Sequence, residues 1–231
     1  MVRAGERHAK MEILSLSTDG VTVRGKRFKL RGSTMATRGF KGRSRADADS
    51  VPPGQFVTDD FPVLTAGPSP EISTGNWQMQ VTDGIVSKTY EWDSLHALGL
   101  EKVTVDIHCV THWTKFATTW EGVPVGALFE DAGVGDAEHV LATSFGDYTT
   151  NIPTTDLVDR EAMIAVSFDG DAIEPEHGGP VRLLVPHLYF WKSAKWLREL
   201  RLTDDEPQGF WEAAGYHNYG NPWLEQRYAG D

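Results

Sequence analysis

The chain has 231 residues, of which 40% are hydrophobic and 24% charged, a composition typical of a water-soluble globular protein. Its single cysteine, Cys109, excludes an internal disulfide framework, and no apolar run is long enough for an integral membrane segment. The net charge is -11, although the first 45 residues hold 12 of the 22 lysines and arginines and 3 of the 33 acidic residues. The acidic remainder argues against nucleic acid as a partner.

Residues 1–50 differ from the rest of the chain in their basic composition, which predicts a flexible segment outside the packed domain. Within them, "TVRGKRFKLRG" alternates weakly and predicts a hairpin around Arg24-Gly25. An alternative interpretation is that the native protein starts at Met35 and that the residues before it are not part of it. We recognise no secretion signal in this segment and therefore expect a cytoplasmic protein.

The first half of the compact part, which begins at residue 51, combines a loop, strands and a short helix. Five prolines and two glycines in Val51–Pro70 exclude a regular helix and predict a braced loop with apolar anchors at Phe56, Phe61, Val63 and Leu64. The segments "NWQMQVTDG" and "IVSKTYEW" predict a hairpin at Asp83-Gly84. "DSLHALG" predicts a helix that Asp93 caps and Gly99 ends, and "KVTVDIHCV" alternates as a strand.

The second half contains further short strands. Pro124 and Gly133 bracket a predicted helix, and "EHVLATSF", "AMIAVSFDG" and Val181–Val185 predict strands. "AKWLRELRLT" favours a closing strand over a helix, and a short helix with an aromatic tail follows from residue 207. Because these strands do not alternate with helices in βαβ order, the sequence predicts an α+β fold with mixed β-sheets and short helices.

Cys109 lies in "DIHCVTHWTKF", where three ordinary interpretations compete. It is a buried core residue, a zinc ligand together with His108 and His112, or a nucleophile with His177 or His187 as its base. A strand places His108 and Cys109 on opposite faces, which argues against zinc. A fourth interpretation is a thiolate ligand to a soft metal that a cofactor mainly holds, for which one cysteine is enough.

Four stretches of the chain resemble a known family. They are "VPPGQ", "FPVLTAGPSP", "DIHCVTHWTKFATTWEGVP" and "HGGPVRLLVPHLYFWKSAKWLRELRLTDDE". Together they are similar to the sulfite oxidase–like molybdopterin oxidoreductases, in particular to short members like the catalytic subunit of bacterial protein-methionine-sulfoxide reductase. The resemblance implies that residues 51–231 form a domain with the sulfite oxidase molybdopterin-binding fold.

The resemblance also implies a molybdenum-molybdopterin cofactor and assigns residues to it. Cys109 would be the metal ligand, Arg182 would bind the pterin or its phosphate, and the segment Ser193, Ala194 and Lys195 would hold the phosphate. The remaining cofactor-binding candidates are Leu64, Thr65, Ala66, Gly67, Thr143, Ser144 and His177. His108, His187 and His112 are candidate proton donors, since histidine titrates near neutral pH.

The implied activity is oxygen-atom transfer by a molybdopterin-dependent oxidoreductase. We expect sulfoxide-type reduction rather than sulfite oxidation, because few arginines lie beyond the basic segment to gather around an anion. The substrate would be a small-molecule or protein-bound sulfoxide, and a separate electron-transfer partner would exchange electrons with the cofactor. A non-catalytic molybdopterin-binding protein and a zinc-binding protein are the alternatives.

Overall fold

The computed structural model of the chain describes residues 51–231 and two short strands nearer the N-terminus. These strands, β1 (Thr22–Val23) and β2 (Lys26–Arg27), pair antiparallel, which agrees with the hairpin predicted around Arg24-Gly25. The predicted flexibility of residues 1–50 otherwise concerns residues outside the described part of the chain. The two strands belong to a unit of their own, separate from the domain described below.

One six-stranded sheet is organised by its longest strand, β7. The sheet consists of β3 (Phe56–Val57), β6 (Glu101–His108), β7 (Trp113–Pro124), β10 (Met163–Phe168), β11 (Asp171–Ala172) and β12 (Arg182–Leu184). β6 runs antiparallel along most of β7, whereas β3 and β10 pair with opposite ends of β7. Gly122 permits the close approach of β10, since a Cβ atom there would lie 2.2 Å from the carbonyl oxygen of Ile164.

The second sheet of the domain has five strands. Its order is β5 (Ser87–Glu91), β4 (Gln78–Thr82), β13 (Leu197–Thr203), β8 (His139–Ser144) and β9 (Thr149–Pro153). β13 runs parallel to β4, and the other neighbours are antiparallel. The strands predicted around Asp83-Gly84 and the closing strand are therefore confirmed, as is the prediction of mixed sheets.

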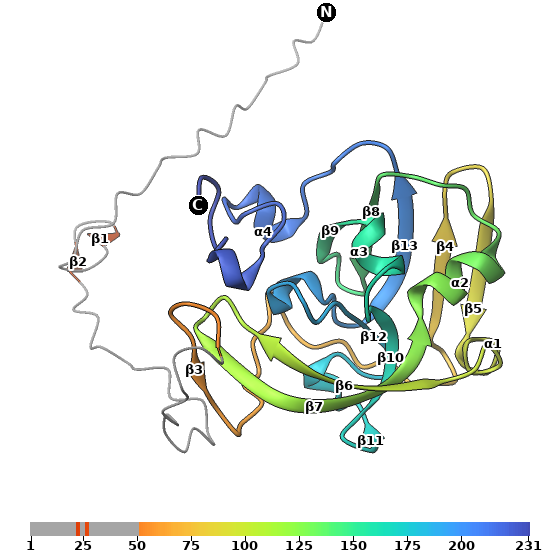
Figure 1. Ribbon diagram of the computed structural model, residues 1–231, viewed down its shortest axis with the longest axis horizontal. Coiled ribbons are helices and arrows are strands. Elements are labelled where there is room, and N and C mark those ends of the chain that lie inside the picture. Colours follow the sequence, from red (N-terminus) through yellow and green to blue (C-terminus); the bar gives the residue numbers. More distant parts are fainter. Residues whose placement is uncertain (1–21, 24–25, 28–50) are drawn as a thin grey trace, which may run out of the picture. The chain divides into compact units, whose positions relative to one another are not determined.

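The helices are short and lie beside the sheets (Figure 1). They are α1 (Trp92–His96), α2 (Val125–Ala132), α3 (Thr154–Val158), α4 (Phe210–Ala213) and the 3₁₀ turns η1 (Pro175–His177), η2 (Phe190–Lys192) and η3 (Pro222–Leu224). α2 begins after Pro124 and ends at Gly133, whose φ of 67° is left-handed, as predicted. The predicted cap of α1 was wrong: Glu91, not Asp93, is the N-cap, and its amide donates to Ser94 Oγ.

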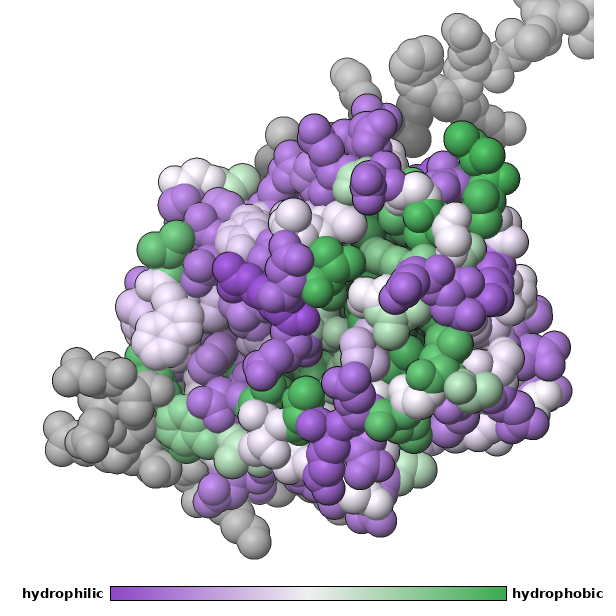
Figure 2. All heavy atoms as spheres, turned by 45° about the vertical axis from the view of Figure 1, so that its right-hand side comes forward, coloured by the Kyte–Doolittle hydropathy of each residue, from purple (hydrophilic) through white to green (hydrophobic). Residues whose placement is uncertain are grey.

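Two hydrophobic clusters fill the domain. The larger one lies among β4, α2, β8 and β13 and includes the fully buried Leu128, Ile152 and Leu197. The smaller one surrounds Cys109 and Trp113 with aromatic side chains of the six-stranded sheet. The face in Figure 2 is mostly hydrophilic with apolar residues between. In the described part of the chain, no helix is long and apolar enough to cross a membrane.

Candidate functional site

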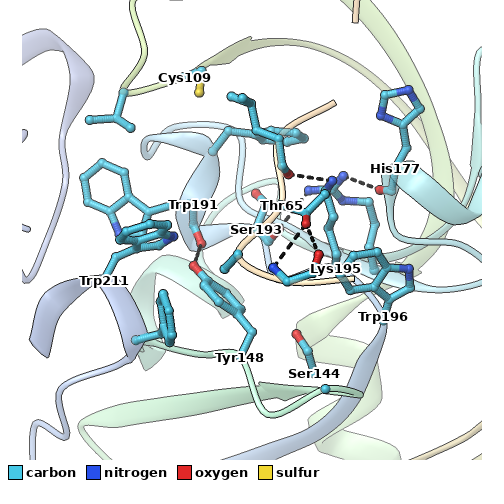
Figure 3. Close-up of a pocket in the computed structure, with 18 of the residues that line it drawn as sticks. Thr65, Cys109, Ser144, Tyr148, His177, Trp191, Ser193, Lys195, Trp196 and Trp211 are labelled. Atoms are coloured by element: carbon cyan, nitrogen blue, oxygen red, sulfur yellow. Dashed lines mark hydrogen bonds between the residues drawn. The ribbon is translucent and has the colours of Figure 1, made fainter. Parts of the chain in front are cut away.

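A cavity of about 580 Å³ opens where loops from both sheets meet (Figure 3). Its walls come from the loop 61–68, the turn after β6, the turn after β8, β12, η2 and the segment 210–216. These segments are far apart in sequence, so the fold alone brings their side chains together. Cys109 and Arg182 both line this cavity.

Cys109 occupies a tight turn between β6 and β7. Its amide donates to the carbonyl of Trp113 at 2.8 Å, and the amide of His112 donates back to the Cys109 carbonyl at 3.0 Å. His112 closes the turn with a φ of 75°. The cysteine sulfur lies 3.1 Å from Thr111 Oγ1. Burial raises the pKa of the Cys109 thiol, whereas the Thr111 contact and the charges of Arg227 and Lys195 oppose this rise.

Positively charged side chains gather at another part of the cavity wall. Arg182 is 1% exposed, and its guanidinium donates to the carbonyls of His177 at 2.6 Å and Ser193 at 2.8 Å. Lys195 donates to the carbonyls of Leu64 and Glu176 at 2.8 and 2.6 Å. Within the described residues neither cation forms an ion pair with a carboxylate. This arrangement suits an anionic ligand, because buried positive charge is costly without a partner.

The pKa values of three basic side chains at this end of the cavity are lowered. Burial, with a smaller contribution from Arg182, lowers the pKa of Lys195 to about 7, and burial lowers the pKa of Arg182 to about 9. Burial and the two neighbouring cations lower the pKa of His177 to about 4, so its ring is neutral at pH 7. The His177 ring stacks on Phe61, with ring centroids 4.0 Å apart. A bound anion would offset the repulsion among these groups.

Several polar atoms of the cavity wall are buried without a hydrogen-bond partner among the described residues. They are Ser144 Oγ, His177 Nδ1 and Trp113 Nε1. Buried polar groups in folded proteins are nearly always paired, so these atoms mark positions where a ligand would donate or accept. Together with the cations they describe a site for a polar, anionic group.

The sequence of this region matches a family model. The model is described as the oxidoreductase molybdopterin binding domain, and it matches residues 66–211. The chain belongs to this family. It is therefore a molybdopterin-dependent oxidoreductase, its cofactor is molybdenum-molybdopterin, and the family expected from the sequence is confirmed.

Relatives in the molybdopterin family differ in length. The chain is 39% identical over 195 residues to the uncharacterized oxidoreductase YuiH of Bacillus subtilis, and this match covers 83% of the chain and 98% of the relative. It is 30% identical to the putative protein-methionine-sulfoxide reductase subunit YedZ1 of Azospira oryzae, over 65% of the chain. It is 24% identical to the protein-methionine-sulfoxide reductase catalytic subunit MsrP of Gluconobacter oxydans, over 70% of the chain. The chain spans 58% and 59% of the last two relatives.

A solved structure shares the fold. It is the sulfane dehydrogenase SoxCD from Paracoccus pantotrophus, with a TM-score of 0.54 and 22% identity. The match covers 59% of the chain and 40% of the SoxCD chain. The likeness confirms the predicted sulfite oxidase-like fold.

The cavity fits the molybdopterin of this family. The phosphate of the cofactor needs buried positive charge and donors, which Arg182 and Lys195 supply. The pterin edge needs fixed polar partners, and the unpaired Ser144 and His177 atoms are of this kind. Cys109 supplies a soft sulfur in the same cavity.

Ten of the residues predicted to form the site line the cavity. They are Leu64, Thr65, Ala66, Gly67, Cys109, Ser144, His177, Arg182, Ser193 and Lys195. The loop that contains the first four is exposed, so the prediction that Leu64 is an apolar anchor was wrong: it is 43% exposed. A hydrogen bond from Lys195 Nζ to the Leu64 carbonyl instead connects this loop to the rest of the domain.

The other predicted site residues lie outside the cavity lining. Thr143 precedes Ser144 on β8, where side chains alternate between the two faces of the sheet, and Ala194 is fully buried in the larger cluster. His108 is 5% exposed and contacts Thr114 Oγ1 at 2.9 Å, and burial lowers its pKa to about 4. His187 Nε2 contacts Asp156 Oδ1 at 2.9 Å on α3. Proton donation by His108 or His187 therefore has no geometric support.

Sequence reasoning missed Trp211 and Tyr216, which belong to an aromatic wall of the cavity. Trp191, Trp211 and Tyr216 line the cavity, and the Tyr216 ring lies 5.2 Å from Trp191 and 5.0 Å from Trp211. Lys192 follows Trp191 in the sequence, and Glu212 follows Trp211. These two charged residues form a buried ion pair, which connects the two segments. Glu212 also accepts from the Trp191 ring nitrogen at 3.0 Å. The aromatic tail after residue 207 was the only indication of Trp211 and Tyr216 in the sequence.

The lowered pKa of Lys195 predicts a pH-dependent stability. Between about pH 7 and the ordinary 10.5, the unfolded chain binds more protons at Lys195 than the folded chain, so this residue makes stability rise with pH in that window. In cofactor-free protein, the melting temperature of the wild type relative to Lys195→Met should therefore increase from about pH 6 to about pH 10. A difference in melting temperature between the two proteins that stays constant over this pH range would contradict the lowered pKa of Lys195.

Proposed function

We propose that this oxidoreductase transfers an oxygen atom from sulfoxide-type substrates. The observation that supports it is the division of the cavity: Figure 3 shows Cys109, Trp191 and Trp211 on one side of the cavity and His177 and Lys195 on the other. Arg182 and Lys195, the arginine and lysine of the cavity lining, lie at the cofactor end, so the lining on the Cys109 side is mainly aromatic and apolar. Such a surface favours an uncharged, sulfur-containing substrate over sulfite.

In this proposal Cys109 is the protein ligand to molybdenum, and Arg182, Lys195 and Ser193 hold the phosphate of the cofactor. Ser144, His177 and the loop 64–67 bind the pterin. When bound, the cofactor supplies the two-electron chemistry of oxygen-atom exchange. The substrate is reduced to a thioether, while two electrons and two protons convert its oxygen to water.

The protein wall governs access to this chemistry. Trp191 is held by Glu212 and by stacking on Tyr189 at 5.3 Å, so the wall is rigid before a substrate arrives. Tyr148 adds a bond from its hydroxyl to the Trp191 carbonyl at 2.6 Å. Rigid aromatic rings exclude water and contact the apolar groups of a substrate.

Support for a sulfoxide comes also from the relatives, two of which are named methionine-sulfoxide reductase proteins. We further propose that a separate electron-transfer partner supplies the electrons. The cytoplasmic location stays a prediction.

The direct test is an activity panel on purified protein, in which a reduced dye is paired with a sulfoxide or an N-oxide and an oxidised dye is paired with sulfite. We expect dye oxidation with the sulfoxide and little or no oxidation of sulfite. Preferred sulfite oxidation would contradict the proposal. Bound cofactor without turnover of any of these compounds would favour a non-catalytic molybdopterin-binding protein.

Zinc is the alternative metal. Among the described residues, ligand-type side chains converge only at Glu174, Glu176 and His177, a group that does not include Cys109. The His108 ring is directed instead to Thr114. Metal analysis that found zinc and no molybdenum would overturn the assignment of Cys109.

Trp211→Ala tests the aromatic wall. A sulfur or ring contact with an aromatic side chain contributes up to about 1.5 kcal/mol, so KM for an aryl methyl sulfoxide should rise roughly tenfold with little change in kcat. Dimethyl sulfoxide, which has less apolar surface, should be affected much less.

Trp223→Ala is the matched control, because Trp223 is 52% exposed and lies outside the cavity lining. It should leave both KM values unchanged. An equal loss for both substrates in Trp211→Ala would mean that Trp211 does not discriminate between them.

A further inference from the structure

The C-terminal segment, beyond the residues matched by the family model, returns to the turn that carries Cys109. Arg227 is its main contact: the side chain is 7% exposed although it lies near the chain end. Its Nη1 donates to the Val110 carbonyl, and its Nη2 donates to the Pro53 carbonyl at 3.2 Å. One side chain thus joins the turn after β6 to the loop before β3.

Two side chains hold successive carbonyls of the turn. Gln55 Nε2 donates to the Cys109 carbonyl at 3.0 Å, and Arg227 binds the next carbonyl, that of Val110. The peptide groups on both sides of Val110 are therefore fixed. A fixed backbone limits the cysteine sulfur to the few staggered positions of its one rotatable bond, and the contact with Thr111 Oγ1 at 3.1 Å marks the position taken here.

Arg227 is itself held in place. Its guanidinium carbon lies 5.0 Å from the ring centroid of Tyr189, and its Nε lies 3.5 Å from Glu225 Oε1. Its own amide donates to Asp231 Oδ2 at 3.0 Å. Glu225 is half-exposed, so solvent screens its ion pair with Arg227, and the pair only partly offsets the positive charge of the guanidinium.

We propose that Arg227 is a positioning residue for Cys109, which orients the cysteine turn and places a permanent positive charge at this turn, outside the cavity lining. This role rests on the proposed function of Cys109 as the metal ligand. An arginine suits it, since the planar guanidinium binds two carbonyls at once and stays charged. The charge favours the more negative, reduced state of a redox centre at the sulfur.

Arg227→Gln and Arg227→Lys separate the two parts of the role. Glutamine loses the charge and one carbonyl contact, whereas lysine keeps the charge. Arg201→Gln is the matched control, because Arg201 lies on β13 with an exposed side chain. Melting temperatures of all variants show whether each one folds.

The first measurement is amide hydrogen exchange of the full chain made without cofactor. In Arg227→Gln, the amides of Cys109 and His112 should exchange about tenfold faster, which corresponds to the loss of one charged hydrogen bond. Amides of β13 should be unchanged, and Arg201→Gln should match the wild type. Unchanged exchange at Cys109 and His112, or a uniform acceleration over residues 51–231, would overturn the orienting role.

The second measurement is the reduction potential of molybdenum in the holoenzyme. Arg227→Gln should shift it to a more negative value, and Arg227→Lys should remain near the wild type. An unchanged potential in Arg227→Gln would overturn the charge effect. Wild-type protein without molybdenum would defeat the proposed function, whereas the exchange measurement would still test the contact of Arg227 with the turn.

Discussion

Replacing Cys109 with serine is expected to abolish turnover while the domain remains folded. Loss of an outer partner of a metal ligand typically costs 10- to 100-fold in activity or affinity, so loss of the ligand itself should reduce kcat more than about 100-fold. Serine has nearly the same size, and the backbone bonds of the turn do not involve the sulfur. Steady-state kinetics and the melting temperature of cofactor-free protein measure the two effects.

Thr111→Val is the matched variant for this experiment. It removes the hydroxyl that lies 3.1 Å from the cysteine sulfur but leaves the sulfur in place. We expect a smaller loss, within about 10- to 100-fold. Full activity in Cys109→Ser would refute the assignment of the thiolate as a ligand, whatever the effect of Thr111→Val.

Arg182→Met should give the largest combined loss of cofactor and stability. Methionine fills the space beside Phe190, 4.2 Å from the guanidinium, but leaves the carbonyls of His177 and Ser193 without their donor. Each unpaired buried carbonyl costs about 1–3 kcal/mol, so the free energy of unfolding should fall by about 2–6 kcal/mol. Chemical denaturation measures this fall, and pterin analysis measures the cofactor.

Arg198→Met is the control for Arg182→Met. Arg198 is 46% exposed and lies 3.8 Å from Asp147, so its removal should change the free energy of unfolding by less than about 0.5 kcal/mol. Its cofactor content should equal that of the wild type. Normal cofactor content in Arg182→Met would show that this arginine does not hold the phosphate.

Local chemistry made part of the fold predictable. Pro124 and Gly133 mark the ends of α2 because each residue imposes its own backbone angle. The strand β7 was not predicted, although it is the longest. Its sequence is mixed because it pairs with three other strands and is partly buried on both faces, and such long-range contacts leave little periodicity.

The limits of prediction differ for the site. The resemblance indicated Cys109, Arg182 and Lys195, and the structure places them in one cavity. The strand pattern placed His108 on the face opposite Cys109 but did not predict its surroundings: it is buried beside Thr114, and its ring lies 6.1 Å from that of Trp223. The C-terminal residues that contact His108 and form part of the aromatic wall are distant from their partners in the sequence. No local sequence pattern predicts such contacts.

X-ray absorption at the molybdenum edge tests the central claim most directly, because it counts the sulfur ligands of the metal. In the purified holoenzyme we expect molybdenum bound by the two dithiolene sulfurs of the pterin and by one further sulfur. In Cys109→Ser the further sulfur should be missing. Protein without molybdenum, or a sulfur count that Cys109→Ser leaves unchanged, would contradict the account.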